Sequence, residues 1–295
     1  MKIPLITICT FLLAITAHGE NKRHLQNLQK TGHCKNCDLS GADLRGMDLS
    51  EARLVKANLS GANLASVNLS NANADQVNFS DANLEGAVLS GAKVRVADLR
   101  NANLNGADLS NAELDKSDLR GATLVGVDAS FADFSGAVLN RTAFNEANLA
   151  GANLALTNIY KADFTSANLQ MSDFGAKSRA QSSGGYGAIF TGANMSRMDL
   201  SQADFTGLDL RDVDFSNSTL VEAKFFRTDI TDANLTGANL TGALGLNDKQ
   251  FESARTCRTK WKEEVWSEDC IASMTDPFSF GADFDLPPEL IRPAP

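Results

Sequence analysis

Apolar residues recur at every fifth position over most of the chain. They run from Leu39 to Phe174 in unbroken steps of five, and the same spacing resumes at Phe190 and continues to Leu240. We refer to these residues as centres. The residue two places before a centre is small, most often Ala, and the residue directly before it is usually Asp or Asn. A period of five fits neither an α-helix, at about 3.6 residues per turn, nor a strand, which alternates every two residues.

A square coil explains this period, with one repeat on each side and a turn at each corner. The centre and the small residue before it would point inward, and the other three residues of the repeat would point outward. Asp and Asn adopt turn conformations and hydrogen-bond to their own backbone, so we expect them at the corners. Ala suits the small position because it lets opposite walls of the coil approach closely. The pattern therefore predicts a stack of narrow coils with an apolar interior.

The repeats, such as DLSGA at residue 38 and NLSGA at residue 58, resemble the A(D/N)LXX motif of the pentapeptide-repeat family. The resemblance covers residues 34–174 and 188–245. It implies an all-β fold, a right-handed quadrilateral parallel β-solenoid of about ten coils with short helical caps at both ends. At a strand spacing of about 4.8 Å the rod would be about 47 Å long. Residues twenty apart would then stack on adjacent coils. The aromatic pairs expected to stack are Phe144 with Phe164 and Phe205 with Phe225.

Several charged residues should line up on the outside of adjacent coils. Opposite charges at this spacing indicate surface ladders, with a binding stripe as the functional alternative. The expected ladders are Asp75 with Arg95 and Asp115, and Lys93 with Glu113. Arg100 and Arg120 stack as like charges with no evident partner, which is a weak indication of an anion-binding spot.

The repeat is interrupted once, between Phe174 and Phe190. Sixteen residues separate these centres, which gives eleven extra residues rich in Gly and Ser. We expect residues 175–187 to form a loop ejected from the solenoid, and inserted loops on solenoids often lie on the binding face. The alternative is a tolerated insertion without a role, because surface loops cost little closure entropy. The candidate partner-binding residues of this loop are Lys177, Arg179 and Tyr186.

The first nineteen residues have the pattern of a secretory signal peptide. A positively charged start precedes an uncharged, mostly apolar run over residues 4–17, and small residues follow where a signal peptidase cuts, before Glu20. The apolar run is shorter than the roughly 20 residues of a membrane-spanning helix. The sequence therefore predicts export to a periplasm, an organelle lumen or the outside. An uncleaved N-terminal anchor is the alternative.

The two ends of the solenoid need covers, because an open sheet edge invites pairing with other chains. We expect a helical cap over residues 20–33 and a second over 246–273, which would start at Asn247 or Asp248. Residues 274–295 hold five of the six prolines and predict an extended tail. The apolar residues expected in the caps are Leu25 and Leu28 in the first, and Phe251 and Trp261 in the second.

Four cysteines remain after the signal peptide, and an even number in an exported chain indicates disulfides. The two pairs lie at opposite ends of the rod, so the pairing favoured by distance is Cys34–Cys37 and Cys257–Cys270. Buried thiols are the alternative. A redox motif or half of a zinc site has less support, since there is no βαβ context and two further zinc ligands are missing. Haem attachment requires a His after such a pair, whereas His33 precedes it.

An enzyme is the class with the least support. The formal charge of −9 argues against a nucleic-acid binder. Outside the signal peptide the only histidines are His24 and His33, and no phosphate loop, nucleophile elbow or metal triad is present, so we expect no catalytic site, no metal and no cofactor.

We expect an exported structural or interaction scaffold with an unknown protein partner, no stable membrane insertion after cleavage, and a monomeric or dimeric state. The alternative comes from the resemblance: some family members mimic DNA and protect type II topoisomerases from quinolones. Export and paired cysteines count against that role. Acids concentrated on one continuous face would favour it, and the mixed ladder at Asp75, Arg95 and Asp115 does not.

Overall fold

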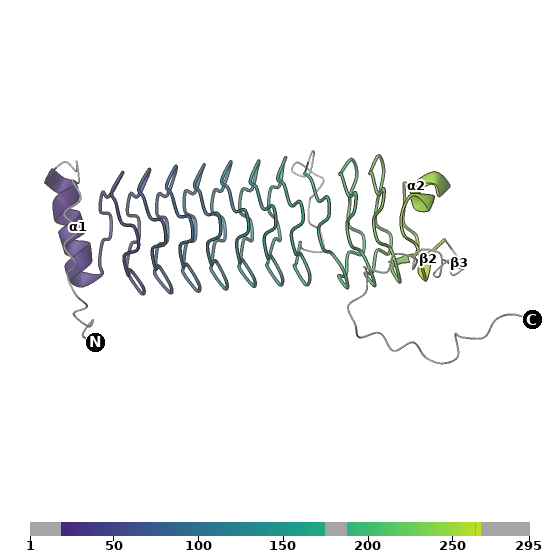
Figure 1. Cartoon of the computed structure of the whole chain (residues 1–295), viewed down its shortest axis with the longest axis horizontal. Helices are drawn as coiled ribbons and strands as arrows, with labels where there is room; N and C mark the ends of the chain where they lie inside the picture. The colour runs from purple at the N-terminus through teal and green to yellow at the C-terminus, as the bar shows by residue number, and fades with distance from the viewer. Residues whose placement is uncertain (1–18, 175–187, 263, 267–295) are drawn as a thin grey trace, which may run out of the picture.

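The chain folds into a straight rod of stacked coils. In a computed structural model, residues 19–174, 188–262 and 264–266 are described, and all structural statements refer to these. Figure 1 shows narrow coils following one another along the rod, with α1 at one end and α2, β2 and β3 at the other. The fold is a right-handed quadrilateral β-solenoid, as the sequence predicts.

Adjacent coils are joined by backbone hydrogen bonds at a spacing of 20 residues. The residue before most centres forms a parallel bridge with its equivalent on the next coil, as Asp38 does with Asn58 and Asn58 with Asn78. The N–H of Leu39 donates to the carbonyl of Asn58 at 2.7 Å, and the N–H of Asn58 donates to the carbonyl of Cys37 at 2.8 Å. Each coil therefore serves as the template for the next.

The interior is filled by the centres and by the small residues two places before them. Most residues of both sets are buried, whereas the other three positions of each repeat, except Ser196, are half-buried or exposed. The predicted aromatic stacks are present: the ring centroids of Phe144 and Phe164 lie 5.1 Å apart, and those of Phe205 and Phe225 lie 5.3 Å apart. Buried Leu and Phe side chains of this kind each stabilise the fold by about 1.5–3 kcal/mol.

Each corner is made by the residue two places after a centre. Every such residue in the described part, from Asn36 to Met171 and from Gly192 to Gly242, has a positive φ. Gly adopts this left-handed conformation without strain, and Asn and Asp tolerate it better than most residues. Bulky residues occupy it too, as at Phe131, whose φ is 57°.

The expected position of Asp and Asn at the corners is wrong. The Asp or Asn before each centre lies in the strand-like part of the coil, where its backbone forms the inter-coil bridge. Its side chain still hydrogen-bonds to the nearby backbone, because Oδ1 of Asp48 accepts the N–H of Ser50 at 3.1 Å. The Nδ2 of Asn68 also donates to Oδ1 of Asp48 at 3.0 Å, so these side chains link the coils as well.

We name the four sides by their first centres: side A starts at Cys34, side B at Leu39, side C at Leu44 and side D at Leu49. Chain order runs from A to D on every coil. Side B is therefore opposite side D, and sides A and C lie between them.

The interrupted coil has 26 residues, six more than the 20 of the others. Phe164 stacks on Phe190 with centroids 4.9 Å apart, and Nε2 of Gln170 donates to Oγ of Ser196, a residue 26 positions later. The expectation of eleven extra residues is wrong because Phe174 is on side A and Phe190 is on side C. The chain between them therefore spans the place of one side B repeat and is six residues longer than two sides require. The predicted loop itself, residues 175–187, lies outside the described residues.

The N-terminal end is covered by α1, Gly19–Thr31. Leu25 and Leu28 are buried against the first coil. His24 joins the helix to that coil, since its Nδ1 lies 3.2 Å from both the amide nitrogen and the carbonyl oxygen of Asp38. Residues 1–18, which carry most of the predicted signal peptide, lie outside the described residues. Within the described chain, no helix has the length and apolar character needed to cross a membrane.

In its described residues, the C-terminal end is only partly helical, unlike the helical cap expected over 246–273. Helix α2 covers only Asp248–Glu252, with Asn247 as its N-cap. After it, β2, Thr259–Trp261, pairs in parallel with β1, Asn239–Leu240, and β3, Glu264–Trp266, pairs antiparallel with β2. The last full coil has an edge of unpaired backbone N–H and C=O groups. A strand that pairs with this edge satisfies those groups, whereas a helix at the same place would leave them exposed.

The rings of Phe251 and Trp261 close the apolar interior at this end. Both side chains are buried, and their centroids lie 4.1 Å apart. The hydroxyl of Thr259 takes the inward small position and donates to the carbonyl of Leu235 at 2.7 Å. The solenoid backbone thus continues past the last recognisable repeat. The predicted tail, 274–295, lies outside the described residues.

Gly245, which stands where the previous coil has the centre Phe225, should be less replaceable than the corner glycine Gly46. A Cβ there would lie 2.6 Å from the backbone nitrogen of Phe226, whereas a Cβ at Gly46 would meet nothing within 4 Å. Both have positive φ, so an Ala costs about 1–2 kcal/mol at either site through the left-handed conformation. We expect Gly245→Ala to lose a further 1–3 kcal/mol, roughly, because backbone must move. Urea unfolding of both variants measures this, and equal losses would contradict it.

Stability should fall in acid through the aspartates that precede centres. Hydrogen bonds from the Ser50 hydroxyl and N–H lower the pKa of Asp48, and those from Ser201 lower the pKa of Asp199. A lowered folded-state pKa stabilises the protein above the unfolded pKa of about 4, and this contribution is lost as pH falls through the folded value.

The Asp48→Asn/Asp199→Asn variant keeps the acceptor oxygens and removes the titration. We expect its free energy of unfolding, measured in urea at several pH values, to fall less between pH 4 and pH 2, approximately, than that of the unchanged chain. A fall of the same size in both proteins would show that these carboxyls are not responsible.

Candidate interaction surfaces

Side A carries a mixed-charge ladder on the N-terminal half of the rod. Arg95 donates Nη2 to Asp75 at 2.6 Å and lies 3.5 Å from Glu113, and the Lys93 ammonium lies 4.0 Å from Glu113. The hydrogen bond from Arg95 lowers the pKa of Asp75. Asp115, the expected third rung, attracts the Arg95 guanidinium and also forms an ion pair with Lys116, at 3.8 Å. These pairs neutralise side A locally.

Arg100 and Arg120 on side B do have partners, which corrects the expectation of two unpaired like charges. Arg100 donates Nε and Nη2 to the two oxygens of Asp98 at 2.8 and 2.6 Å. Arg120 binds Asp118 in the same way. In each pair the aspartate lies two residues before the arginine. The centre between them points inward, so both charged side chains lie next to each other on the outside of the coil. The hydrogen bond from Arg100 lowers the pKa of Asp98.

The same Asp-Leu-Arg arrangement occurs twice on side C. Arg45 holds Asp43 through Nε and Nη2 at 2.8 and 2.7 Å, and Arg211 holds Asp209 at 2.9 and 2.6 Å. Each of these arginines stands alone, since no other arginine lies on the adjacent coil of its side. Side B is therefore the only side of the described rod where two such units follow one another directly.

Side D differs from the other three because the rows directly before and directly after its centres, its two outward rows, contain no Lys or Arg in the described rod, and its corner row contains Arg197. Its carboxylates are Asp48, Asp108, Asp128 and Asp214. The row after the centres is made of small side chains with one exception, Gln170. In order this row is Ser50, Ser70, Ser90, Ser110, Ser130, Ala150, Gln170, Ser196, Ser216 and Thr236.

The insertion leaves side D intact. It spans the place of one side B repeat, on the opposite wall, and the bridges of side D continue across it, as between Asn168 and Asn194. Side D is therefore a flat, unbroken surface over ten coils. The serine row is visible in the sequence, since Ser recurs every twenty residues from Ser50 to Ser130. It was missed because a period of five treats all four sides of the coil alike, and only a period of twenty distinguishes them.

The described chain holds two of the predicted disulfide cysteines together. Cys34 and Cys37 form a disulfide with Cα atoms 5.2 Å apart, and both side chains are buried in the first coil. Cys257 is a disulfide cysteine, whereas its predicted partner Cys270 lies outside the described residues. No group of three or more His, Cys, Asp or Glu side chains in the described residues is arranged to hold a metal ion.

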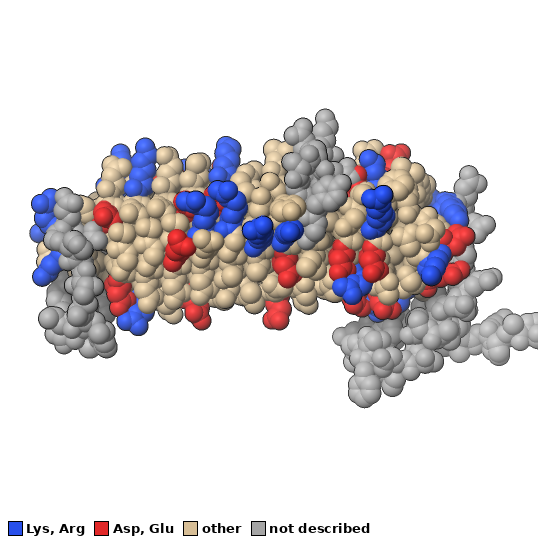
Figure 2. Space-filling view, turned by 90° about the horizontal axis from the view of Figure 1, so that it is seen from above, with Lys and Arg blue, Asp and Glu red and all other residues tan. Residues whose placement is uncertain are grey.

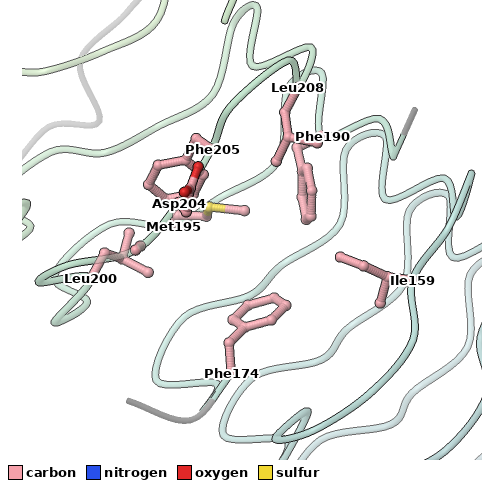
Figure 3. A pocket seen from close by; sticks show the side chains of 9 residues that line it. Ile159, Phe174, Phe190, Met195, Leu200, Asp204, Phe205 and Leu208 are labelled. Carbon is pink, nitrogen blue, oxygen red and sulfur yellow. The ribbon is translucent and has the colours of Figure 1, made fainter. Parts of the chain in front are cut away.

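The predicted binding-loop residues Lys177, Arg179 and Tyr186 lie outside the described residues. Next to this part of the chain, the interior contains a cavity of about 40 Å³. In Figure 3 the side chains of Ile159 and Phe174 face those of Phe190 and Met195 across it. The cavity lies where side B lacks a described centre, between Ile159 and Phe205. It exceeds the roughly 10–15 Å³ that one water needs but is far below the roughly 300 Å³ of a small-molecule pocket. It is therefore too small to hold a small-molecule ligand.

Comparison with solved structures finds two pentapeptide repeat proteins and a fluoroquinolone resistance protein. HetL, a pentapeptide repeat protein involved in heterocyst differentiation regulation from the cyanobacterium Nostoc sp. strain PCC 7120, is 26% identical, with 82% of this chain and 97% of HetL covered and a TM-score of 0.43. QnrB1, a plasmid-mediated fluoroquinolone resistance protein, is 19% identical, with 71% and 91% covered and a TM-score of 0.42. A pentapeptide repeat protein from the Arabidopsis thaliana thylakoid lumen is 25% identical, with 52% and 73% covered and a TM-score of 0.22.

No curated protein matches the sequence. The family described as pentapeptide repeats does, with 8 copies over residues 33–170, 186–207 and 209–244. These matches fall on the coils themselves and leave out most of the insertion. Since they cover more than half of the chain, the protein belongs to the pentapeptide-repeat family.

Proposed function

We propose that this protein is an exported, non-catalytic scaffold that binds a protein partner along side D. The observation that carries the proposal is the unbroken run of small, mostly hydroxyl side chains on this side, without a single Lys or Arg in its two outward rows. Pentapeptide-repeat proteins are generally structural or interaction proteins, which agrees with this role.

Side D suits a long, flat protein interface. A Ser hydroxyl both donates and accepts a hydrogen bond, so most coils offer the partner one adaptable contact. Ser and Ala lose little rotamer freedom on burial, whereas Lys or Arg would lose up to about 2 kcal/mol each. Ten coils at about 4.8 Å give a strip of about 43 Å, long enough for a partner to contact many coils at once.

Export is supported by two separate features of the chain. Residues 1–19 have the charged start, apolar run and small-residue site of a cleaved signal peptide. The Cys34–Cys37 disulfide belongs to an oxidising compartment, because cytosolic thiols are kept reduced. If cleavage occurs before Glu20, the mature chain begins within the first turn of α1 and retains the helix that covers the first coil.

DNA mimicry is the second candidate, because side D carries acids and no cations in its outward rows. Its four carboxylates are spread over ten coils, and several carboxylates of sides A and B are paired with Arg or Lys. B-DNA presents a negative charge about every 1.7 Å along its axis, far more densely than side D does. A topoisomerase supercoiling assay with the purified protein distinguishes the two roles.

Intact mass of the protein from its own host tests export and thiol state together. We expect a chain that starts at Glu20 and gains the mass of four hydrogen atoms on reduction, two for each disulfide. A chain that retains Met1 and has free thiols would overturn the exported-scaffold proposal and make topoisomerase protection the leading candidate.

Partner binding should depend on side D and not on side B. Ser90→Lys/Ser110→Lys places two cations on adjacent coils of side D, and Ser60→Lys/Ser80→Lys does the same on side B. In the host, site-specific cross-linking from side D should identify a partner with the unchanged protein. We expect roughly tenfold less cross-linking with the side D variant, because two long cations at the centre of an interface prevent close packing there. An equal reduction in both variants would place the interface elsewhere.

A further inference from the structure

Four basic residues lie on successive coils of side B and its corner with side C. Arg100 and Arg120 follow the centres of side B, and Arg141 and Lys161 occupy the next two corner positions. At the coil spacing of about 4.8 Å they span about 15 Å along the rod. Figure 2 shows Lys and Arg side chains that follow one another along one face at the middle of the rod. We call these four residues the basic row.

The first half of the basic row borders a polar groove. The groove is lined by Ser80, Asp81, Arg100, Asn101 and Arg120. Both arginines use Nε and Nη2 for their own aspartates, and neither Nη1 has a hydrogen-bond partner among the described residues. Nδ2 of Asn101 donates to Oδ1 of Asp81 at 3.1 Å, which fixes the far wall. The groove thus offers unused guanidinium donors beside hydroxyl, amide and carboxylate groups.

The second half of the basic row has fewer internal partners. Neither Arg141 nor Lys161 forms an ion pair within the described part of the chain. The Lys161 ammonium lies 5.4 Å from the centroid of the Tyr160 ring. Between the two halves, Oδ1 of Asn140 is buried without a hydrogen-bond partner among described groups. Charged donors and a ring therefore continue along the same line for four coils, whereas the buried Asn140 oxygen is not accessible to a ligand at the surface.

We propose that the basic row and its groove bind an acidic polysaccharide, a chain of sugars that carries a carboxylate or a sulfate on its units. Arginine is suited to these planar or tetrahedral anions because its donors are arranged as a fork. Ser80, Asn101 and Asp81 supply the donors and acceptors that sugar hydroxyls require. A linear ligand with evenly spaced charges matches cations that repeat once per coil.

Other polyanions fit the row less well. A protein binds a nucleic acid mainly by neutralising its phosphates, which releases counterions. A row of four cations with three carboxylates nearby, on a chain of net charge −9, can neutralise few phosphates. An acidic peptide cannot add a strand here, because the backbone of side B already bonds to the coils on both sides, as Leu119 does to Val138. The carboxylate of Asp81 also disfavours a dense run of phosphates.

The test is calorimetric titration of the purified full chain with oligogalacturonate at low salt. Dextran sulfate tests whether a sulfated polysaccharide binds. Methyl-esterified oligogalacturonate tests whether the negative charge is needed. Poly-L-glutamate and duplex DNA test whether other classes of polyanion bind. We expect binding to at least one acidic polysaccharide that weakens as salt is added, since exposed charges are screened. Stronger binding to poly-L-glutamate or DNA, or no binding to either acidic polysaccharide, would overturn the proposal.

Matched variants assign the binding to the basic row. Arg100→Gln/Arg120→Gln and Arg141→Gln/Lys161→Gln should each lower the affinity about tenfold, the loss expected for charge-assisted hydrogen bonds. Arg45→Gln/Arg211→Gln removes the same Asp-Leu-Arg pairs from side C and should leave the affinity unchanged. Thermal unfolding checks that all three variants remain folded.

An equal loss of affinity in the side C control would show non-specific attraction and overturn the assignment. Because this binding is measured on side B, its failure leaves the partner-binding proposal for side D untouched.

Discussion

Closure of the coil after 20 residues is the constraint on which the rest of the structure depends. A left-handed residue at each corner turns the chain, and four corners bring the backbone to the point where its N–H and C=O groups face those of the preceding coil. Buried backbone groups must be paired, so once one coil is formed the next is fixed in register. This explains why residues as unsuited to the left-handed region as Val96, with φ of 55°, are held there. The inter-coil hydrogen bonds of the corner offset a local strain of about 1–2 kcal/mol.

The outward side chains are not needed for this closure, and the four sides therefore carry different chemistry on one backbone. Side A has an ion-pair ladder centred on Arg95, side B has the basic row, and side D has the serine row. The insertion obeys the same logic, because it spans the place of one side B repeat while the bridge between Asn168 and Asn194 keeps side D in register. A longer loop costs little closure entropy once both of its ends are fixed by packed coils.

The sequence predicts what the period of five determines: the solenoid, the inward residues and the Phe144–Phe164 stack. The period does not show on which side of the coil a centre lies after the repeat is interrupted at Phe174. For this reason the size of the insertion was predicted wrongly. The period also misses β2, because Thr259 and Trp261 no longer fit the motif although the edge of the previous coil still directs their backbone. The partner of Arg100 was missed for a related reason, since pairs twenty residues apart were considered and the hydrogen bond to Asp98, two residues away, was not.

Opposite sides of a rigid solenoid can bind different ligands without interference. Each coil contacts mainly its neighbours, so a change in an outward side chain of side B is transmitted poorly across the packed interior to side D. Substitutions at distant sites without shared partners are additive to within about 0.5 kcal/mol. A chain that binds a polyanion on side B and a protein on side D would therefore join the two with independent affinities. Such a bridge requires rigidity and two separate surfaces, both of which follow from the closed, 20-residue coil.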